Sequence, residues 1–221
     1  MFNLTKLLSR GGTSGPLSAD VQAALDVWRQ HPVPALDDVH FHTRYVVLDI
    51  TCSGMNPESD QLISVAANTV QRAMILPGDS LFIDFSTPEI DDATVNRQLM
   101  AFLQFVGKAP LVTYHVPFVG GFLQHAIKTR LDVDFEPPWI DLAWLLPATF
   151  SDKGDGIMPL DNWIEAFSLD AGSGRRSAIE NTLMLARIFQ MLLVRATRKE
   201  IVTASGLVKE SQANIMLRRT N

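Results

Sequence analysis

The spacing of hydrophobic residues changes several times along the chain, and each change predicts a different element. Apolar residues recur every three or four positions over about 19–30, which predicts a helix. Short apolar or alternating runs follow at 44–49, 61–70 and 81–85, with turn residues between them, including 76–78. Three short strands joined by tight turns indicate an antiparallel meander.

Helical and strand patterns then alternate through the rest of the chain. Helical spacing is found at 95–106, after Pro117, at 160–167 and at 177–196, and strand patterns are found at 109–114 and at the start of 139–146, which leads into a helix. Strands interleaved with helices in this way predict an α/β fold.

These patterns divide the chain into three predicted parts. Residues 1–43 form an N-terminal extension with one helix, residues 44–197 form the main domain, and residues 198–221 form a polar C-terminal tail. The 221 residues are enough for one domain with a full core, and a hydrophobic content of 47% excludes an intrinsically disordered chain.

The composition narrows the class of protein further. Cys52 is the only cysteine, which excludes a disulfide or a cysteine zinc site within one chain and favours a reducing, cytoplasmic setting. No apolar run approaches the roughly 20 residues that span a bilayer, and the first residues lack a secretory signal, so we expect no membrane association. Residues 172–221 hold 9 Lys/Arg against 3 Asp/Glu, a net charge of +6. These cations either lie on solvated helix faces or meet phosphates.

Three segments combine a predicted element with polar residues at its end. They are VVLDITCSGMNPESDQLISVAA, in which Asp49 ends a strand, LVTYHVPFVGGFL at 111–123, and GRRSAIENTLMLARIF at 174–189. In order and spacing, the set resembles the DnaQ-like (DEDDh) 3′–5′ exonuclease family, which includes the proofreading epsilon subunit of bacterial DNA polymerase III. The resemblance covers about 44–197 and implies an RNase H-like α/β fold, with a mixed five-stranded sheet flanked by helices.

The resemblance also implies a particular chemistry. In the family, four carboxylates hold two Mg²⁺ or Mn²⁺ ions that clamp the attacking and leaving oxygens of a phosphodiester, and a histidine takes the proton from the attacking water. Of these five positions, the sequence keeps only the first acid, Asp49. Thr51 stands in place of Glu, and Val119 in place of Asp. Arg176 stands in place of His, and Asn181 in place of Asp.

The formal charge at these five positions argues against a pair of bound metal ions. Asp49 contributes −1 and Arg176 contributes +1, a total of zero where the family has four carboxylates. Asp49 is at most a lone metal ligand, so we expect no cofactor, with Mg²⁺ or Mn²⁺ needed only if the chain is active. We expect the Arg176 guanidinium to lie beside Asp49 and to fill part of the ion space. We expect Glu180 to face away from the site, because neighbouring helical residues point about 100° apart.

Part of the implied nucleotide contact remains in the sequence. Ser53, Gly54 and Met55 match the turn that lies against the terminal nucleotide in the family. A retained groove of this kind can stack a base or hold a single strand without cutting it. His40 and His42 share one face of an extended segment, but without a third ligand nearby we expect surface histidines and not a metal pair.

Three hypotheses follow for the function. We favour a member of the exonuclease family that has lost metal-dependent hydrolysis and binds single-stranded nucleic acid or serves as an accessory protein. The second hypothesis is an active 3′–5′ exonuclease with a rearranged site that uses Asp49 and other acids. The third is a scaffold that binds another protein or a second copy of itself. Substitutions at four of the five catalytic positions favour a pseudoenzyme.

Overall fold

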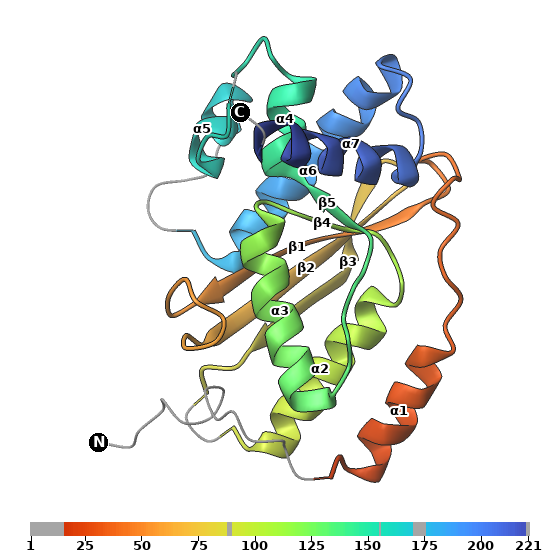
Figure 1. The fold of residues 1–221 in the computed structure, drawn as a ribbon, viewed down its shortest axis with the longest axis vertical. Helices are drawn as coiled ribbons and strands as arrows, with labels where there is room; N and C mark the ends of the chain where they lie inside the picture. The colour runs from red at the N-terminus through yellow and green to blue at the C-terminus, as the bar shows by residue number, and fades with distance from the viewer. Residues whose placement is uncertain (1–15, 88–89, 155, 170–175, 220–221) are drawn as a thin grey trace.

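A mixed five-stranded sheet lies at the centre of the molecule (Figure 1). The computed structural model describes residues 16–87, 90–154, 156–169 and 176–219. The strands are β1 (Arg44–Cys52), β2 (Leu62–Gln71), β3 (Met74–Asp84), β4 (Leu111–Thr113) and β5 (Trp139–Asp141). Across the sheet their order is β3-β2-β1-β4-β5, with β1, β2 and β3 paired antiparallel and β4 parallel to both β1 and β5. The predicted fold class, an RNase H-like α/β fold with a mixed five-stranded sheet, is confirmed.

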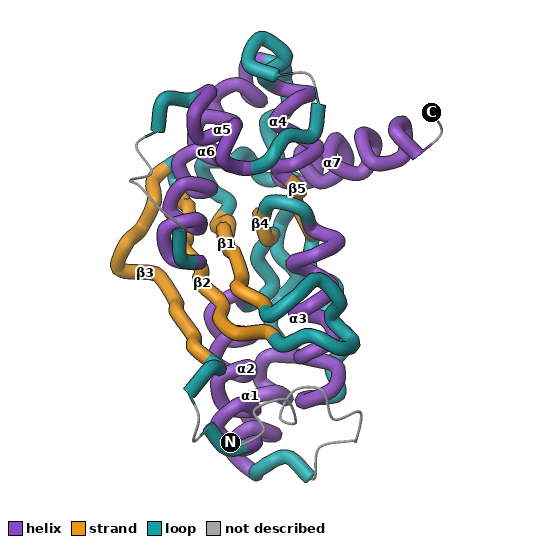
Figure 2. The backbone as a smooth tube through the Cα atoms, turned by 90° about the vertical axis from the view of Figure 1, so that its left-hand side faces the viewer, coloured by secondary structure: helices purple, strands orange, loops and turns teal. Residues whose placement is uncertain are grey.

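Helices cover both faces of this sheet (Figures 1 and 2). They are α1 (Ala19–Arg29), α2 (Asp92–Val106), α3 (Val116–Leu131), α4 (Leu142–Thr149), α5 (Leu160–Ala166), α6 (Ala178–Arg198) and α7 (Ala204–Arg219). The helices predicted from hydrophobic spacing are all present, with ends that shift by a few residues. The longest, α6, begins with a capping box, in which the Ser177 and Glu180 side chains each accept a hydrogen bond from the other's backbone N–H.

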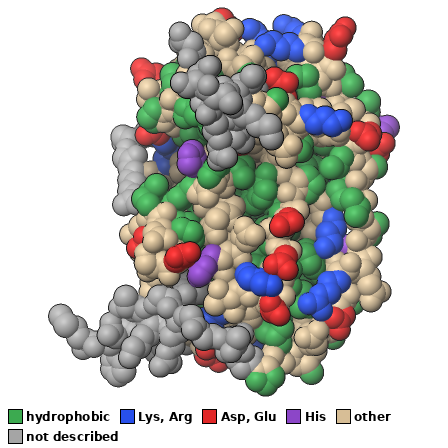
Figure 3. Space-filling view, in the orientation of Figure 1, with side chains coloured by type: hydrophobic (Ala, Val, Ile, Leu, Met, Phe, Trp, Pro, Cys, Tyr) green, Lys and Arg blue, Asp and Glu red, His purple; other side chains and the backbone are tan. Residues whose placement is uncertain are grey.

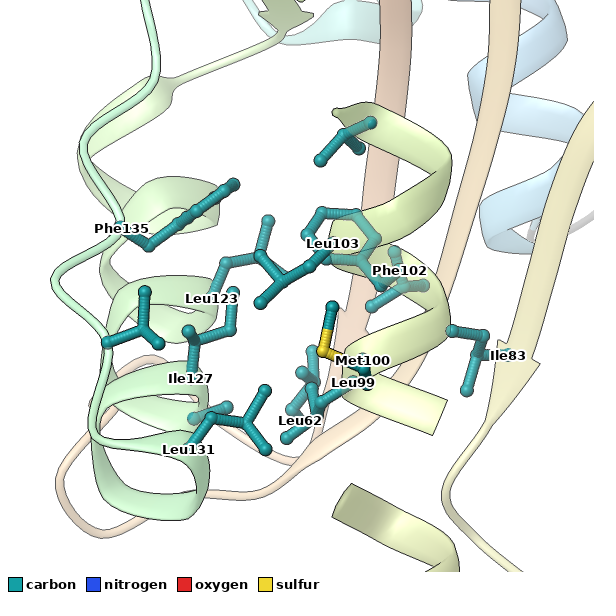
Figure 4. Close-up of a cluster of buried hydrophobic side chains, with 14 of the residues drawn as sticks. Leu62, Ile83, Leu99, Met100, Phe102, Leu103, Leu123, Ile127, Leu131 and Phe135 are labelled. Atoms are coloured by element: carbon teal, nitrogen blue, oxygen red, sulfur yellow. The ribbon is translucent and has the colours of Figure 1, made fainter. Parts of the chain in front are cut away.

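The side chains of β1 point alternately to the two faces of the sheet and belong to two separate hydrophobic cores. Val46 and Leu48 point to one side and belong to a buried cluster with α1, α2 and α3, part of which is drawn in Figure 4. Tyr45 and Val47 point to the other side and belong to a cluster with α4, α5, α6 and α7. Side chains two residues apart on a strand share a face, so Asp49 follows Tyr45 and Val47 onto the side of α6.

The edge strand β3 begins earlier than predicted. We expected a turn at 76–78 and a strand only from 81, but β3 extends from Met74 to Asp84. The turn residues are accommodated by an irregularity, since Leu76 pairs with Thr69 and Ser80 with Asn68, which leaves the residues around Pro77 out of the ladder. Proline and bulges are typical of edge strands, where they interrupt the row of free backbone groups.

The C-terminal segment is a packed helix where we expected a polar tail. Ala204, Leu207 and Ser211 of α7 are buried, and the Ser211 hydroxyl accepts a 3.1 Å hydrogen bond from the backbone N–H of Asp141 in β5. Their spacing of three and four residues places them on one face of α7. That face is short and built partly from small or polar residues, which explains why it is inconspicuous in the sequence. The division of the chain into three parts remains a prediction.

Several basic residues of the C-terminal portion hold neighbouring elements in place. Arg195 pairs with Asp152 at 2.6 Å, and the Lys199 ammonium donates a hydrogen bond of 2.7 Å to the carbonyl oxygen of Ala148. On the face shown in Figure 3, Lys and Arg side chains are interspersed with Asp and Glu and do not form one large basic patch. Within the described ranges, no helix is both long and apolar enough to cross a bilayer.

His40 is buried, contrary to the expectation of a surface histidine, whereas His42 is exposed as expected. The Nδ1 of His40 lies 2.6 Å from the Tyr45 hydroxyl, and its Nε2 lies 3.0 Å from the carbonyl oxygen of Ile201. Both ring nitrogens therefore have protein partners, and burial lowers the pKa of the imidazole. His40 thus joins the segment before β1 to the segment before α7.

Candidate functional site

The carboxyl end of β1 opens into a cleft of about 1130 Å³. The cleft is lined by β1 and the turn that follows it, by β2, and by the beginnings of α3, α5 and α6: Ile50, Thr51, Cys52, Ser53, Gly54, Met55, Ile63, Phe118, Leu160, Asp161, Arg176, Ser177, Glu180 and Asn181. Of the site residues predicted from the sequence, only Asp49 and Val119 are missing from this lining. The fold therefore brings together residues that lie more than 120 positions apart in the sequence.

Asp49 is bonded to the residue that replaces the last acid of the family motif. The Asn181 Nδ2 donates a 2.9 Å hydrogen bond to Oδ2 of Asp49. Burial raises the pKa of Asp49 to about 6, while the bond from Asn181 and the charge of Arg176 oppose this rise. The Asn181 amide, in the first turn of α6, thus provides a hydrogen-bond donor to Oδ2 of the buried Asp49 carboxylate.

Arg176 reaches Asp49 only through Asn181. Its Nε donates a 2.8 Å hydrogen bond to Oδ1 of Asn181, and its Nη2 forms an ion pair with Asp161 of α5. The expected direct pairing of the guanidinium with Asp49 is therefore wrong. The reason is that the Asn181 side chain lies between the two groups and donates to one while it accepts from the other. We call Asp161, Arg176, Asn181 and Asp49 the cleft relay.

Val119 lies in the core and not in the cleft. Only 1% of its surface is exposed, and it belongs to the buried cluster that includes Leu48 and Phe122. It stands on α3, which begins directly after β4. A valine at this position cannot coordinate a metal ion, and its methyl groups complete the packing between α3 and the sheet.

The turn after β1 forms one wall of the cleft. Ser53 exchanges two hydrogen bonds with Gln61, since its backbone N–H donates to the Gln61 carbonyl oxygen at 2.9 Å and its Oγ accepts from the Gln61 N–H at 2.8 Å. Gly54 leaves room for the Asp60 carboxylate, which a Cβ at residue 54 would overlap. Met55 is 77% exposed, so a large apolar side chain stands at the mouth of the cleft.

Two further groups that line the cleft, the Glu180 carboxylate and the Cys52 thiol, are not available as a metal ligand or a nucleophile. Glu180 lines the cleft, contrary to our expectation that it faces away, but its Oε2 accepts hydrogen bonds from the Ser177 backbone N–H at 2.7 Å and from the Ser177 hydroxyl at 2.9 Å. Burial, together with the charges of Asp49 and Asp60, raises the pKa of the Cys52 thiol to about 12. A thiol held protonated in this way is a packing residue and not a nucleophile.

Two carboxylates that shape the site were not identified from the sequence. Asp161 gave no signal, because it stands alone at the start of a short helix. Asp141 did give one, since it ends a strand as Asp49 does. It is buried and accepts hydrogen bonds from the backbone N–H groups of His115, Val116 and Ala143 at 2.8–3.0 Å. Asp141 thereby fixes the turn from β4 into α3, where His115 adopts a positive φ of 69°.

The residues present do not fit the two metal ions that the family resemblance implies. Across the described part of the chain, no group of three or more His, Cys, Asp or Glu side chains is arranged to hold a metal ion. Asp49 is the only carboxylate among the five motif positions, and its neighbours are an amide and a guanidinium. Hard divalent cations need several oxygen anions, so this donor set is too weak and too nearly neutral.

Comparisons with known proteins agree with this architecture. No family model matches the sequence. Two curated proteins named DNA polymerase III PolC-type, from Thermotoga petrophila and Thermotoga maritima, are each 25% identical in an alignment 183 positions long that covers 76% of this chain. The chain spans only 13% of the length of these relatives.

Two solved structures share the fold. Escherichia coli Exonuclease I in complex with a dT13 oligonucleotide gives a TM-score of 0.53 at 13% identity, covering 71% of this chain and 42% of the exonuclease. Schizosaccharomyces pombe Pop2p in its Mg²⁺- and Mn²⁺-bound form gives a TM-score of 0.52 at 10% identity, covering 82% of this chain and 91% of Pop2p. The RNase H-like exonuclease fold expected from the sequence is thus the fold observed.

Proposed function

Because the chain is a relative of the DnaQ-like 3′–5′ exonucleases, we propose that it binds the end of a single-stranded nucleic acid in the cleft and does not hydrolyse it. The cleft relay is the observation that supports this proposal. At the place where the family chemistry needs carboxylates around two metal ions, an amide donates to Asp49 and a guanidinium donates to the amide. Without the ions, neither the attacking water nor the leaving oxygen is activated.

Other residues that line the cleft offer contacts suited to a single strand. Met55 and Phe118 give apolar surface for a base, and the hydroxyl and backbone groups of Ser53 and Gly54 give polar contacts beside it. Stacking on apolar and aromatic side chains contributes about 1–3 kcal/mol per base and tolerates any sequence. Binding of this kind does not depend on a divalent cation. The oligonucleotide bound to Exonuclease I is consistent with such a cleft accepting single strands.

The test measures binding and hydrolysis in the same samples. A 5′-fluorescein-labelled oligothymidylate and its RNA counterpart are titrated with the full chain in EDTA and in Mn²⁺. We expect salt-sensitive binding in both buffers, with the strands still intact on a denaturing gel. Hydrolysis in Mn²⁺ that disappears in Asp49→Ala would contradict the proposal and support an active exonuclease.

A pair of methionine variants locates the binding. Met55→Ala removes the exposed side chain at the cleft and should weaken binding severalfold. Met74→Ala removes another exposed methionine, 54% accessible, from the β3 edge and should leave binding unchanged. Absence of binding by the folded wild-type chain, together with a stable dimer or protein complex, would contradict strand binding and support a scaffold.

A further inference from the structure

The ion pair between Arg176 and Asp161 lies at the cleft and is unequal in its burial. The Arg176 side chain is only 15% exposed, whereas the Asp161 side chain is 71% exposed. A pair with one partner in solvent contributes little to stability, typically about 0–1 kcal/mol. Asp161 is therefore a partner that Arg176 can lose at small cost.

Asn181 holds the other side of the guanidinium in place. Its Oδ1 accepts the Nε–H bond of Arg176 at 2.8 Å, and its amide is anchored in turn to Asp49. An arginine side chain carries five N–H donors in a planar fork. Among the described residues, the Arg176 hydrogen bonds go from Nε and Nη2 only, so Nη1 has no protein acceptor. The guanidinium is thus oriented, charged and only partly satisfied.

Two other carboxylates, Asp49 and Glu180, feel the Arg176 charge, which acts to lower the pKa of each, but their hydrogen bonds go to other groups. Glu180 is bonded to the backbone and side chain of Ser177, and Asp49 is bonded to Asn181. Asp161 is therefore the one acid that is ion-paired with Arg176 within the described residues. An anion that enters the cleft needs to displace a single exposed carboxylate.

We propose that Arg176 binds a phosphate group of the strand by exchanging Asp161 for that phosphate. The inference rests on the proposed function and names its ligand, a nucleic-acid phosphate bound without metal. A guanidinium meets a phosphate with two parallel hydrogen bonds, and these charge-assisted bonds are stronger than those between neutral groups. Arg176 then supplies from the protein the positive charge that metal ions supply in an exonuclease site. Asp161 acts as a competitor that occupies the guanidinium when no strand is bound.

Two variants with opposite expected effects test the exchange. The labelled oligothymidylate is titrated in EDTA with the full chain. Arg176→Gln removes the phosphate ligand and should weaken binding about tenfold or more, since a hydrogen bond to a charged group contributes about 1.5–3 kcal/mol. Asp161→Asn removes the competitor and should tighten binding about threefold or more. An ion pair that only stabilises the fold predicts weaker binding for both variants.

Controls separate this inference from the proposed function. Arg195→Gln and Asp152→Asn break another partly exposed ion pair, 2.6 Å long, and should change nothing. Arg176→Lys keeps the charge without the fork and should bind between wild type and Arg176→Gln. Thermal melting checks that each variant is folded. If Arg176→Gln binds as tightly as wild type, or if Asp161→Asn binds more weakly than wild type, the exchange is wrong but strand binding stands. If wild type does not bind at all, both proposals are wrong.

Discussion

The Nδ2 of Asn181 lies 2.9 Å from Oδ2 of Asp49 and donates a hydrogen bond to it. In the DnaQ-like exonuclease family that the sequence resembles, both positions carry acids that share metal ions. Here the second position is a donor, so the pair is self-sufficient and needs no cation to offset repulsion. Burial raises the pKa of Asp49 against the effect of this hydrogen bond, so the ionisation of Asp49 can be measured through the pH dependence of folding stability.

Replacing Asp49 by Asn should change how stability depends on pH. Burial raises the pKa of Asp49 to about 6 from its ordinary value of 3.8, so the folded chain binds this proton more tightly than the unfolded chain. Wild type therefore loses stability as the pH rises from about 4 to about 6. Relative to wild type, Asp49→Asn should gain up to about 2–3 kcal/mol in free energy of unfolding between pH 4 and pH 7.

Urea unfolding at several pH values measures this difference. The control, Asp37→Asn, removes a carboxylate that is exposed instead of buried. If the Asp49→Asn profile is parallel to wild type, Asp49 is ionised at low pH and the burial argument is wrong.

Val119→Asp alone should destabilise the chain strongly. Val119 is 1% exposed, and a carboxyl group in the core has no partner there. We expect a loss of about 3 kcal/mol or more in free energy of unfolding. Val27→Asp, at a position 59% exposed, should cost far less. Chemical denaturation compares the two, and equal losses would show that residue 119 is not enclosed in the folded chain.

Restoring all the motif positions together should return metal affinity. The variant carries Thr51→Glu, Val119→Asp, Arg176→His and Asn181→Asp, which restores the residue types of the family motif at all four substituted positions. Divalent ions then offset the repulsion among the carboxylates, so Mn²⁺ should raise the melting temperature of the variant and not of wild type. Calorimetry gives the direct readout. A folded variant that takes up no Mn²⁺ would count against this account of the cleft.

Gly54→Ala should disturb the turn that lines the cleft. The added Cβ overlaps the Asp60 carboxylate, which must move and lose the 2.9 Å hydrogen bond that it accepts from the Asn56 N–H, so we expect a loss of about 1–2 kcal/mol in free energy of unfolding together with weaker strand binding. Gly78→Ala is the matched control, because a Cβ there meets nothing within 4 Å. Equal melting temperatures for the two variants would refute the close packing at Gly54.

Leu207→Ala tests whether α7 is an integral part of the core. Leu207 is 1% exposed, and a Leu-to-Ala change in a core costs about 2–5 kcal/mol. Val202→Ala, at a position 40% exposed, should cost much less. Thermal and urea unfolding provide the comparison. A negligible effect of Leu207→Ala would mean that the segment after α6 is the loose tail that its polar composition suggests.

Hydrophobic spacing was enough to predict most of the fold. The unbroken apolar run from Tyr45 to Leu48 predicts a strand that is buried on both faces, and the repeat along α6 predicts one buried face; the structure shows both. The N-terminal part of β3 was missed because Pro77 and Gly78 are typical turn residues, whereas an edge strand tolerates them in a bulge. The packing of α7 was missed because its buried face includes Ala204 and Ser211, which carry little hydrophobic signal.

The sequence indicated most of the residues that meet at the cleft, but it did not indicate the bonds between them. Family motifs point to Asp49, Arg176 and Asn181, and the fold does bring them together. The order of bonding depends on side-chain lengths and directions that no pattern records. It also depends on Asp161, which α5 brings beside Arg176. A short amide between the carboxylate and the guanidinium therefore replaces the direct pair that charge alone favoured.

The burial of Val119 also determines how readily an acid can be introduced at that position. An acid regained at that position alone would enter the core before its partner acids exist to share a cation. The first step toward a metal centre would then reduce folding yield without any catalytic gain. Selection for a stable core would thus oppose reversion, even if the mouth of the cleft remained free to change.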